Sequence, residues 1–295
     1  MKKFLTFMLG ICLIIPCTLM FSACKKDPGP QMEIWDGTTI EVSEAVNDVI
    51  TIETAEELAG LAKSVNEGTS YEGITIKLTC DMDLANKEWK PIGFGSSGGT
   101  EIMDGNSVPF RGIFDGQNHT IHNLKIISFV GGGLDGTTPS GIGLFGHVIG
   151  SVKNITVNNA TVAGNHYVGA VIGFATGAEI DNCHAKNVTV SCTYANDDES
   201  GDKAGVVIGF ISNTANESSI IKNCSAYSSN VNADRDAGRV LGCLSVNNYG
   251  TETTVNYENL TSDLSVNVSW NQTGDGIKSS SGTNITQDVI GRINN

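Results

Sequence analysis

The residues with the clearest capacity for chemistry are the carboxylates of one polar run, Asp197-Asp-Glu-Ser-Gly-Asp202. Closely spaced carboxylates can bind calcium, which takes about six to eight oxygen ligands. This run lacks the spaced pattern of a defined calcium loop, so a solvated surface turn is the favoured interpretation. Calcium binding by Asp197, Asp198 and Asp202 stays open as the alternative.

The other acidic and histidine residues form no catalytic pattern in the sequence. Asp81 and Asp83 are better explained by a structural role in a turn than by acid/base catalysis. The histidines show no i, i+4 ligand pair and no nearby nucleophile; they are His119, His122, His147, His166 and His184. Neither a serine elbow nor a phosphate-binding loop nor a dinucleotide motif occurs. We therefore expect no catalytic residue, cofactor or metal ligand, and a protein that is not an enzyme.

One cysteine has a different chemistry, because it directly follows a predicted export signal. Lys2 and Lys3 precede an apolar stretch with the layout of a signal peptide, which predicts that residues 1–23 are removed. The ending Phe21-Ser-Ala-Cys24 resembles the bacterial lipobox, although that signature usually has leucine at the position of Phe21. The resemblance implies lipidation of Cys24 by acyl chains such as palmitate. Residues 24–33, polar and rich in proline and glycine, then form a flexible lipid-anchored tether.

The charge of the chain limits its partners. Residues 1–23 contain two lysines and no acidic residue, so their removal changes the formal net charge from −14 to −16. Such a protein repels nucleic acid and anionic headgroups, and membrane attachment must come from the acyl chains. We expect a lipoprotein of the bacterial outer membrane, at the cell surface or, as the alternative, on the periplasmic face. Its candidate ligands are a glycan or a protein.

The body of the chain repeats a short glycine-bounded motif. Its copies are Ile142-Gly-Leu-Phe-Gly146, Gly169-Ala-Val-Ile-Gly173, Gly205-Val-Val-Ile-Gly209 and Gly238-Arg-Val-Leu-Gly242. The closing glycines are 27, 36 and 33 residues apart. At about 3.3 Å per residue, the shortest period makes roughly three strands with their turns, which is one coil of a parallel β-helix.

Each motif is followed by a second element, and stacked coils would align its residues in columns. The second elements are Val152-Lys-Asn-Ile155, Ile180-Asp-Asn-Cys183, Ile221-Lys-Asn-Cys224 and Tyr257-Glu-Asn-Leu260, with Ile121-His-Asn-Leu124 as an earlier, incomplete copy. One predicted column is an amide ladder of Asn123, Asn154, Asn182, Asn223 and Asn259. The preceding residues are His122, Lys153, Asp181, Lys222 and Glu258, whose charges alternate from Lys153 onward.

The repeats resemble the GLUG motif family of bacterial surface and secreted proteins, which implies export and a β-helical repeat but carries no catalytic residues. The block upstream resembles the leading segment of such surface lipoproteins in gut anaerobic bacteria. We therefore expect an all-β fold: a right-handed parallel β-helix (solenoid) with a small α/β N-terminal cap. In this alignment Ile142 stands where the other copies have glycine.

The predicted domains follow from these segments. Residues 34–109 form the N-terminal cap, with a strand from Val49 and an amphipathic helix started by a Thr54/Glu57 capping box. The β-helix covers residues 110–270, and residues 271–295 form a C-terminal coil or cap. Cysteines 80, 183, 192, 224 and 243 sit in apolar contexts as small hydrophobes, with Cys183 and Cys224 as two buried thiols in one column rather than a disulfide.

The function predicted from these features is non-enzymatic binding or adhesion at the cell surface. Recognition would use the loops 131–140, 191–203 and 211–219, because loops on a rigid solenoid carry binding residues. A β-helical polysaccharide lyase or hydrolase is the first alternative, and a structural accessory subunit of a surface assembly is the second. An aligned row of acidic and basic side chains on one face would favour the enzyme, and an exposed aromatic platform would favour glycan binding.

Overall fold

The computed structural model describes residues 32–93, 107–127, 141–193, 203–213, 217–234, 236–246, 254–263, 266–270 and 290–294. The predicted signal peptide, Cys24 and most of the predicted tether lie outside the described residues. The same holds for the acidic run 197–202 and for residues 131–140, which were predicted to take part in recognition. Within the described part of the chain, no helix is long and apolar enough to cross a membrane.

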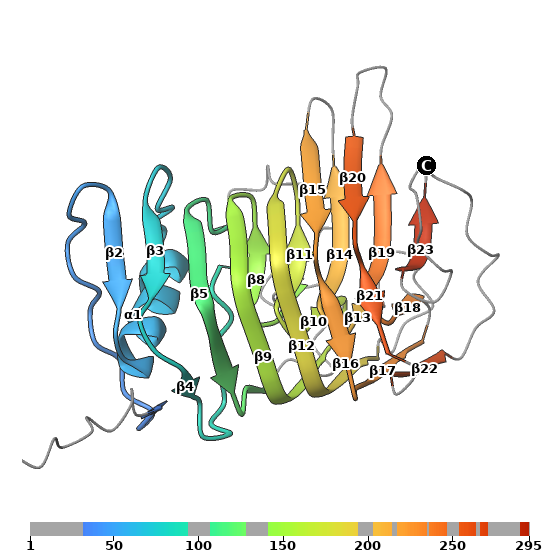
Figure 1. Ribbon diagram of the computed structural model, residues 1–295, viewed down its shortest axis with the longest axis horizontal. Helices are drawn as coiled ribbons and strands as arrows, with labels where there is room; N and C mark the ends of the chain where they lie inside the picture. Colours follow the sequence, from blue (N-terminus) through green and yellow to red (C-terminus); the bar gives the residue numbers. More distant parts are fainter. Residues whose placement is uncertain are drawn as a thin grey trace, which may run out of the picture.

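The N-terminal block combines short strands with a helix. Its elements are β1 (Glu33–Ile34), β2 (Val49–Ile52), α1 (Ala55–Asn66), β3 (Thr75–Leu78) and β4 (Met82–Asp83). The predicted capping box is confirmed: the Thr54 hydroxyl accepts from Glu57 N at 3.2 Å, and the Glu57 carboxylate accepts from Thr54 N. The apolar face of α1, including Leu58 and Leu61, is buried. This face closes one end of the stack of strands (Figure 1).

The rest of the described chain is β-structure arranged in three parallel sheets. The first sheet contains β5 (Ile113–His122), β6 (Lys125–Ile126), β9 (Ser151–Gly164), β12 (Glu179–Cys192), β15 (Ser218–Lys222), β16 (Ser225–Tyr227), β17 (Asn230–Ala233), β20 (Thr254–Glu258), β21 (Thr261–Ser262) and β22 (Asn267–Trp270), together with β1 to β4. The second sheet contains β7 (Gly141–Ile142), β10 (Tyr167–Gly169), β13 (Lys203–Gly205) and β18 (Asp236–Gly238). The third contains β8 (Phe145–Val148), β11 (Ile172–Ala175), β14 (Ile208–Asn213), β19 (Leu241–Val246) and β23 (Ile290–Asn294).

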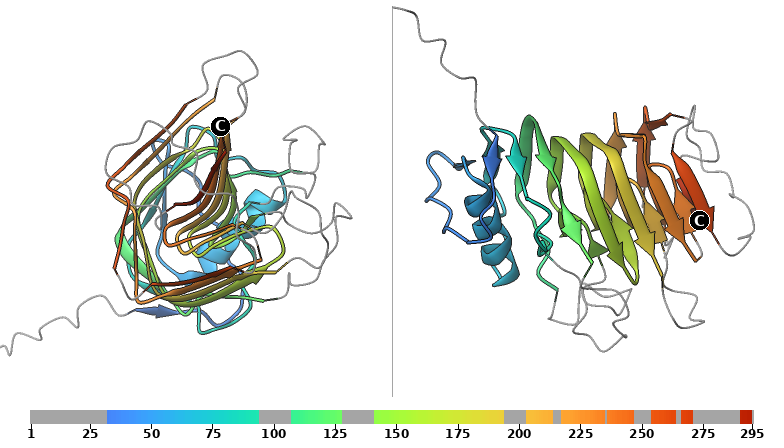
Figure 2. Two further views of the ribbon diagram at one scale, coloured as in Figure 1. Left: turned by 90° about the vertical axis from the view of Figure 1, so that its right-hand side faces the viewer. Right: turned by 90° about the horizontal axis from the view of Figure 1, so that it is seen from below.

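The chain passes through the three sheets in turn and then repeats the circuit. Strand β10 pairs with β13, β11 with β14, and β12 with β15 to β17, each in parallel with the equivalent strand of the next turn. Viewed along the stack, the turns superpose around a common interior (Figure 2). The predicted all-β architecture with parallel pairing between repeats is therefore confirmed at this level.

The long strands of the first sheet bend at asparagines. In β12, Asn182 and Asn187 both have φ of +54°, and in β9 Asn154 and Asn159 have φ of +56° and +55°. Asparagine tolerates this left-handed conformation better than other residues with a Cβ, because its short polar side chain can bond locally. Each bend turns the strand toward the next face, which lets one strand cover two sides of the stack.

The glycines of the repeated motif allow two backbone segments to touch. A Cβ on Gly173 would lie 2.1 Å from Ile142 N, and one on Gly209 would lie 2.5 Å from Val168 N, so no larger residue fits at either position. The predicted alignment of the first copy was wrong, because Ile142 pairs with Val168 rather than with a glycine. The first copy is instead one residue shorter, with Gly143 to Gly146 in place of Gly169 to Gly173.

The interior is a single apolar core filled by side chains in register. One column is Ile76, Phe114, Val152, Ile180 and Ile221, all buried. Burying one such side chain contributes about 1.5–3 kcal/mol, so the stack is stabilised coil by coil. Because the core faces are fixed, each outward side chain also acquires a fixed neighbour on the next coil.

Candidate functional surface

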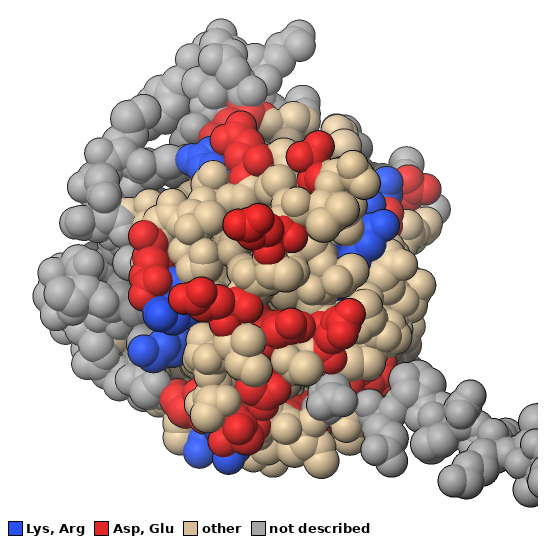
Figure 3. All heavy atoms as spheres, turned by 90° about the vertical axis from the view of Figure 1, so that its left-hand side faces the viewer, with Lys and Arg blue, Asp and Glu red and all other residues tan. Residues whose placement is uncertain are grey.

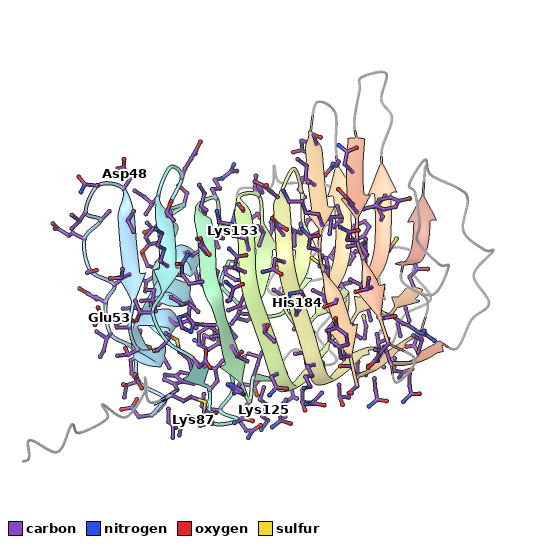
Figure 4. The ribbon with its side chains drawn as sticks, in the orientation of Figure 1. Asp48, Glu53, Lys87, Lys125, Lys153 and His184 are labelled. Atoms are coloured by element: carbon purple, nitrogen blue, oxygen red, sulfur yellow. The ribbon has the colours of Figure 1, made fainter. Side chains whose placement is uncertain are left out.

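A column of alternating charges runs along the outside of the first sheet. Strand register places these residues in sequence across the coils: Lys77, Asp115, Lys153, Asp181, Lys222 and Glu258. The predicted alternation from Lys153 onward is confirmed. The prediction for His122 was wrong, since His122 pairs with Asn158 and the column continues through Asp115 instead. Figure 4 shows Lys153 on the outer side of this sheet.

The reason for this error is a local irregularity in β5. The register between β5 and β9 shifts between Asp115 and His119. Gln117 and Asn118, which lie in this stretch, have positive φ. The motif Ile121-His-Asn-Leu124 consequently aligns with the second bend of the later strands, at Val157 and Asn158, rather than with the first.

Neighbouring charges in the column form ion pairs of moderate length. Lys153 Nζ lies 3.9 Å from Asp115 Oδ2, and Lys222 Nζ lies 3.5 Å from Asp181 Oδ2. Burial acts to raise the pKa of Asp115, but hydrogen bonds from Asn154 and Gln117 N and the charge of Lys153 lower it below its ordinary value. Asp115 is therefore held ionised at neutral pH.

The amide ladder lies beside the charged column and interlocks with it. Where the preceding coil carries an aspartate, the amide donates to it: Asn154 Nδ2 to Asp115 Oδ1 at 2.9 Å, and Asn223 Nδ2 to Asp181 Oδ1 at 2.8 Å. Where that coil carries a lysine, the amide donates to the preceding asparagine instead. These bonds run from Asn182 to Asn154 and from Asn259 to Asn223, both 3.0 Å long, and Asn182 Nδ2 also donates to Asn118 Oδ1 at 3.0 Å. The acceptors of the ladder amides thus alternate along the column between aspartate and asparagine.

Asn123 does not belong to this ladder, so that part of the prediction was wrong. It lies in a second column at the next bend, where Asn159 Nδ2 donates to Asn123 Oδ1. In the same region Asn187 Nδ2 donates to Asn158 Oδ1 at 3.0 Å. Two parallel amide columns, one at each bend, therefore hold the first sheet in register.

A carboxylate and an imidazole meet at the N-terminal end of this face. Asp81 Oδ1 accepts from Thr120 N and contacts His119 Nδ1, both at 3.0 Å. Burial acts to raise the pKa of Asp81, but these two contacts and the charge of His119 lower it. The turn predicted at Asp81 to Asp83 was wrong in part, because Met82–Asp83 is strand β4. Asp83 Oδ1 does accept from Ala85 N at 2.7 Å, as expected of a turn aspartate.

The remaining histidines occupy different environments. His184, on the first sheet, contacts Ser225 Oγ and Asn182 Oδ1, and burial lowers its pKa (Figure 4). His147 is buried and stacks on Phe174, with ring centroids 4.6 Å apart. Burial, followed by the charge of Arg111, lowers the pKa of His147 to about 3. Neither histidine is placed to share a metal ion, and no group of three metal-binding side chains occurs in the described ranges.

The cysteines within the described ranges are all buried; they are Cys80, Cys183, Cys192, Cys224 and Cys243. The predicted column of Cys183 and Cys224 is confirmed by the register of β12 with β15 and β16. Burial, together with the neighbouring Cys224 thiol, raises the pKa of Cys183 well above its ordinary value. Both thiols pack as small apolar groups and are poorly suited to nucleophilic chemistry.

Comparison with known proteins gives one motif and one relative. The family described as "The GLUG motif" matches residues 164–191, which run from the last residue of β9 to the residue before the end of β12. Halomucin of Haloquadratum walsbyi (strain DSM 16790 / HBSQ001) is 30% identical over 149 residues, which are 49% of this chain and 2% of Halomucin. The chain therefore spans only a small fraction of this relative's length.

A solved structure from Bacteroides ovatus is also similar. It is described as a candidate immunoglobulin A1 protease, shares 16% identity, and aligns over 83% of this chain and 84% of its own with a TM-score of 0.38. A similarity of this size carries no inference about fold or activity.

Proposed function

We propose that this chain is a non-enzymatic binding or adhesion lipoprotein of the bacterial outer membrane, anchored through Cys24. Its scaffold, on this proposal, is a right-handed parallel β-helix with an α/β cap. The parallel pairing of equivalent residues on successive turns supports this scaffold, as does the recurrence of one glycine motif at one corner. A stack of this kind offers a long rigid surface on which loops can be displayed.

A location at the cell surface is supported by three features. Residues 164–191 match the GLUG motif, and Halomucin is a relative over part of its length. The lipobox-like ending before Cys24 supplies an anchor that needs no membrane-spanning helix. Two or more acyl chains hold a protein stably at a bilayer, whereas one chain alone binds marginally.

The observation that carries the non-enzymatic proposal is the state of the carboxylates on the outer face. Asp115 and Asp181 are each bound by an asparagine amide and by a lysine. Asp81 and Asp115 both have lowered pKa values, whereas a general acid in glycoside hydrolysis needs a raised one. On this proposal the paired charges stabilise the register of the stack and do not act on a substrate.

One observation favours a second candidate, a carbohydrate-active enzyme. Asp115 and Asp181 lie two coils apart in one column, with Lys153 between them. Two coil spacings of about 4.8 Å separate them by roughly 9–10 Å, near the upper end of the range of about 6.5–9.5 Å used by inverting glycosidases. This spacing alone does not supply a protonated acid, so the binding function is the better supported of the two.

Surface display with wild-type and Cys24→Ala chains tests the proposal. Intact cells that express the wild-type chain should adhere to glycan-coated or protein-coated surfaces, and mild proteolysis of the same cells should remove both the chain and the adhesion. Cells expressing Cys24→Ala should lose adhesion, because the folded part is no longer anchored. Adhesion that is unchanged in a strain lacking the chain would contradict the proposal.

A further inference from the structure

The N-terminal end of the stack carries a concentration of negative charge. Residues 32–62 contain eight acidic residues and no lysine or arginine, whereas the rest of the sequence contains 24 acidic and 18 basic residues. Seen from this end, acidic groups lie across the centre of the face and basic groups lie near its edges (Figure 3). This end therefore differs from the outer column, in which lysines alternate with carboxylates.

Several of these carboxylates are exposed and make no hydrogen bond or ion pair within the described part of the chain; they are Glu41, Glu44, Asp48 and Glu53. Figure 4 shows Asp48 and Glu53 at this end of the stack. Glu56 and Glu57 differ, because their carboxylates accept from Asp36 N and Thr54 N. Exposed like charges repel one another, and a positively charged partner would relieve that repulsion.

Large aliphatic side chains are exposed on the same stretch of chain. Ile34, Ile40 and Val46 are 63%, 50% and 71% exposed, more than the other large apolar side chains of the described ranges. Ile40 directly precedes Glu41, and Val46 lies two residues after Glu44. Single exposed apolar residues are common on protein surfaces, but several on one short segment are typical of a contact surface.

The segment that carries these side chains is fixed against the helix. Ile40 N donates to Glu56 O at 3.0 Å, and Val46 and Val49 exchange two backbone hydrogen bonds of 2.9 and 3.1 Å. A Cβ on Gly60 would lie 1.8 Å from Ile40 O, so only glycine fits where the segment crosses α1. The exposed side chains are thus held in place before a partner arrives, which reduces the entropy lost on binding.

A hollow of about 590 Å³ lies between this segment and the helix. Its lining includes Val42 and Ile74, which are only partly buried, and the carboxylate-bearing Glu41 and Glu44. Lysine and arginine side chains pack their aliphatic stems on apolar groups while the charged end stays near water. The hollow therefore suits a lysine or arginine side chain of a partner.

One lysine of the chain itself also lines the hollow. Lys63 Nζ lies 3.8 Å from Glu67 Oε1, and both side chains are more than half exposed. This pair leaves Glu41 and Glu44 available, since neither makes an ion pair among the described residues. The charge of the hollow thus stays negative overall.

We infer that this end of the stack, defined by Ile40, Glu41, Glu44, Val46 and Asp48, is the docking surface for a basic amphipathic segment of a partner protein. The inference rests on the proposed binding function and names the class of partner. Basic side chains of the partner pair with the carboxylates, and its apolar side chains cover the exposed aliphatic groups. A second copy of this chain does not fit, because two acidic ends repel each other, and neither do nucleic acid or anionic headgroups.

Both kinds of contact are needed for specific binding. Exposed ion pairs contribute little to affinity by themselves and are screened by salt. Opposite charge mainly steers association and discriminates between partners, whereas apolar contact supplies the affinity. A partner with basic residues alone should therefore bind more weakly than one that is also apolar on one side.

Fluorescence anisotropy of labelled peptides, titrated with the purified full chain, tests this inference. The peptides are an amphipathic leucine/lysine peptide, a leucine/glutamate peptide of the same pattern and a serine/lysine peptide of the same charge. The leucine/lysine peptide should bind, and its affinity should decrease with salt. The serine/lysine peptide should bind at least about tenfold more weakly, and the leucine/glutamate peptide should not bind.

Two pairs of variants locate the surface. Glu41→Gln/Glu44→Gln should weaken binding of the leucine/lysine peptide about three- to tenfold, whereas Glu179→Gln/Glu258→Gln should stay within about twofold of wild type. The second variant makes the same change in net charge at exposed positions elsewhere. Val46→Ser should likewise weaken binding more than Ile220→Ser, an exposed apolar position on β15. Melting temperatures of all four variants establish that they fold.

Equal affinity of the two glutamine variants would assign the attraction to net charge and overturn the docking surface. Equal binding of the serine/lysine and leucine/lysine peptides would overturn the amphipathic partner, and no binding of either at low salt would overturn the inference altogether. Whole-cell adhesion separates these failures from that of the proposed function. Adhesion to protein-coated surfaces that is unchanged in Glu41→Gln/Glu44→Gln would overturn the surface alone, whereas absence of any adhesion would overturn the proposed function.

Discussion

Reversing the charge at the centre of the outer column tests the register most sharply. Asp181 lies between Lys153 and Lys222 in adjacent coils, and it accepts a hydrogen bond from Asn223 Nδ2 at 2.8 Å. Asp181→Lys replaces two attractions by two repulsions and removes the acceptor of that amide. Each cross-strand pair contributes about 0.2–1 kcal/mol, and these side chains are partly exposed, so we expect a loss of about 1–3 kcal/mol.

Thermal unfolding followed by circular dichroism measures this loss. For a chain of this size, about 1 kcal/mol corresponds to roughly 2–4 °C, so a loss of about 1–3 kcal/mol predicts a decrease in melting temperature of about 2–12 °C. The decrease should become smaller in 1 M salt, because salt screens repulsion between exposed lysines. Asp181→Asn, which retains an acceptor for Asn223 and adds no positive charge, should fall between the wild type and Asp181→Lys.

The control is Glu72→Lys, an equal change of charge at an exposed position away from the column. Asp263 is a poorer control, since its Oδ1 accepts from Ser228 N at 3.3 Å. If Asp181→Lys melts at the same temperature as Glu72→Lys at low salt, the alternating column does not stabilise the protein. A decrease that is independent of salt would assign the effect to the lost hydrogen bond alone.

Three further predictions concern the amide ladder, a buried histidine and the anchor. In urea unfolding, Asn182→Ala should destabilise the fold by about 1–3 kcal/mol more than Asn256→Ala. The variant removes a ladder amide and leaves alanine at a φ of +54°. Equal urea midpoints for the two variants would contradict the ladder. Burial lowers the pKa of His147 to about 3 in the folded state, whereas in the unfolded chain His147 binds a proton below about pH 6.5. The free energy of unfolding should therefore decrease as pH falls between these values, by up to about 1.4 kcal/mol per pH unit. His147→Phe should make that decline shallower, and an identical profile would show that other groups control it. Cys24→Ala should leave the membrane fraction on cell fractionation, whereas an unchanged membrane-bound share would exclude lipidation at Cys24.

The parts of the fold that follow from local patterns could be predicted from the sequence. The capping box at Thr54 and the apolar face of α1 need only residues within a few positions of each other. The column through Lys153, Asp181 and Lys222 could also be predicted, because one short motif recurs with the same internal spacing in each coil. Stacking equivalent motifs then brings distant residues together without further information.

The errors occur where spacing changes between coils. The irregular stretch between Asp115 and His119 displaces the earlier motif by one bend, so Asp115 rather than His122 continues the charged column. The glycine motif at Gly146 is shorter by one residue, which misplaced Ile142. The pair of Asp81 with His119 depends on a contact between two segments that share no motif.

The central claim is that the protein binds its ligand without catalysing a reaction, and one measurement tests it most directly. The purified full chain is incubated with a panel of polysaccharides, and the amount of bound polymer and the number of new reducing ends are determined in the same samples. The account predicts bound polymer of unchanged chain length and no increase in reducing ends. Turnover that is lost in Asp115→Asn or Asp181→Asn, while melting temperatures are maintained, would contradict it and establish the charged column as an active site.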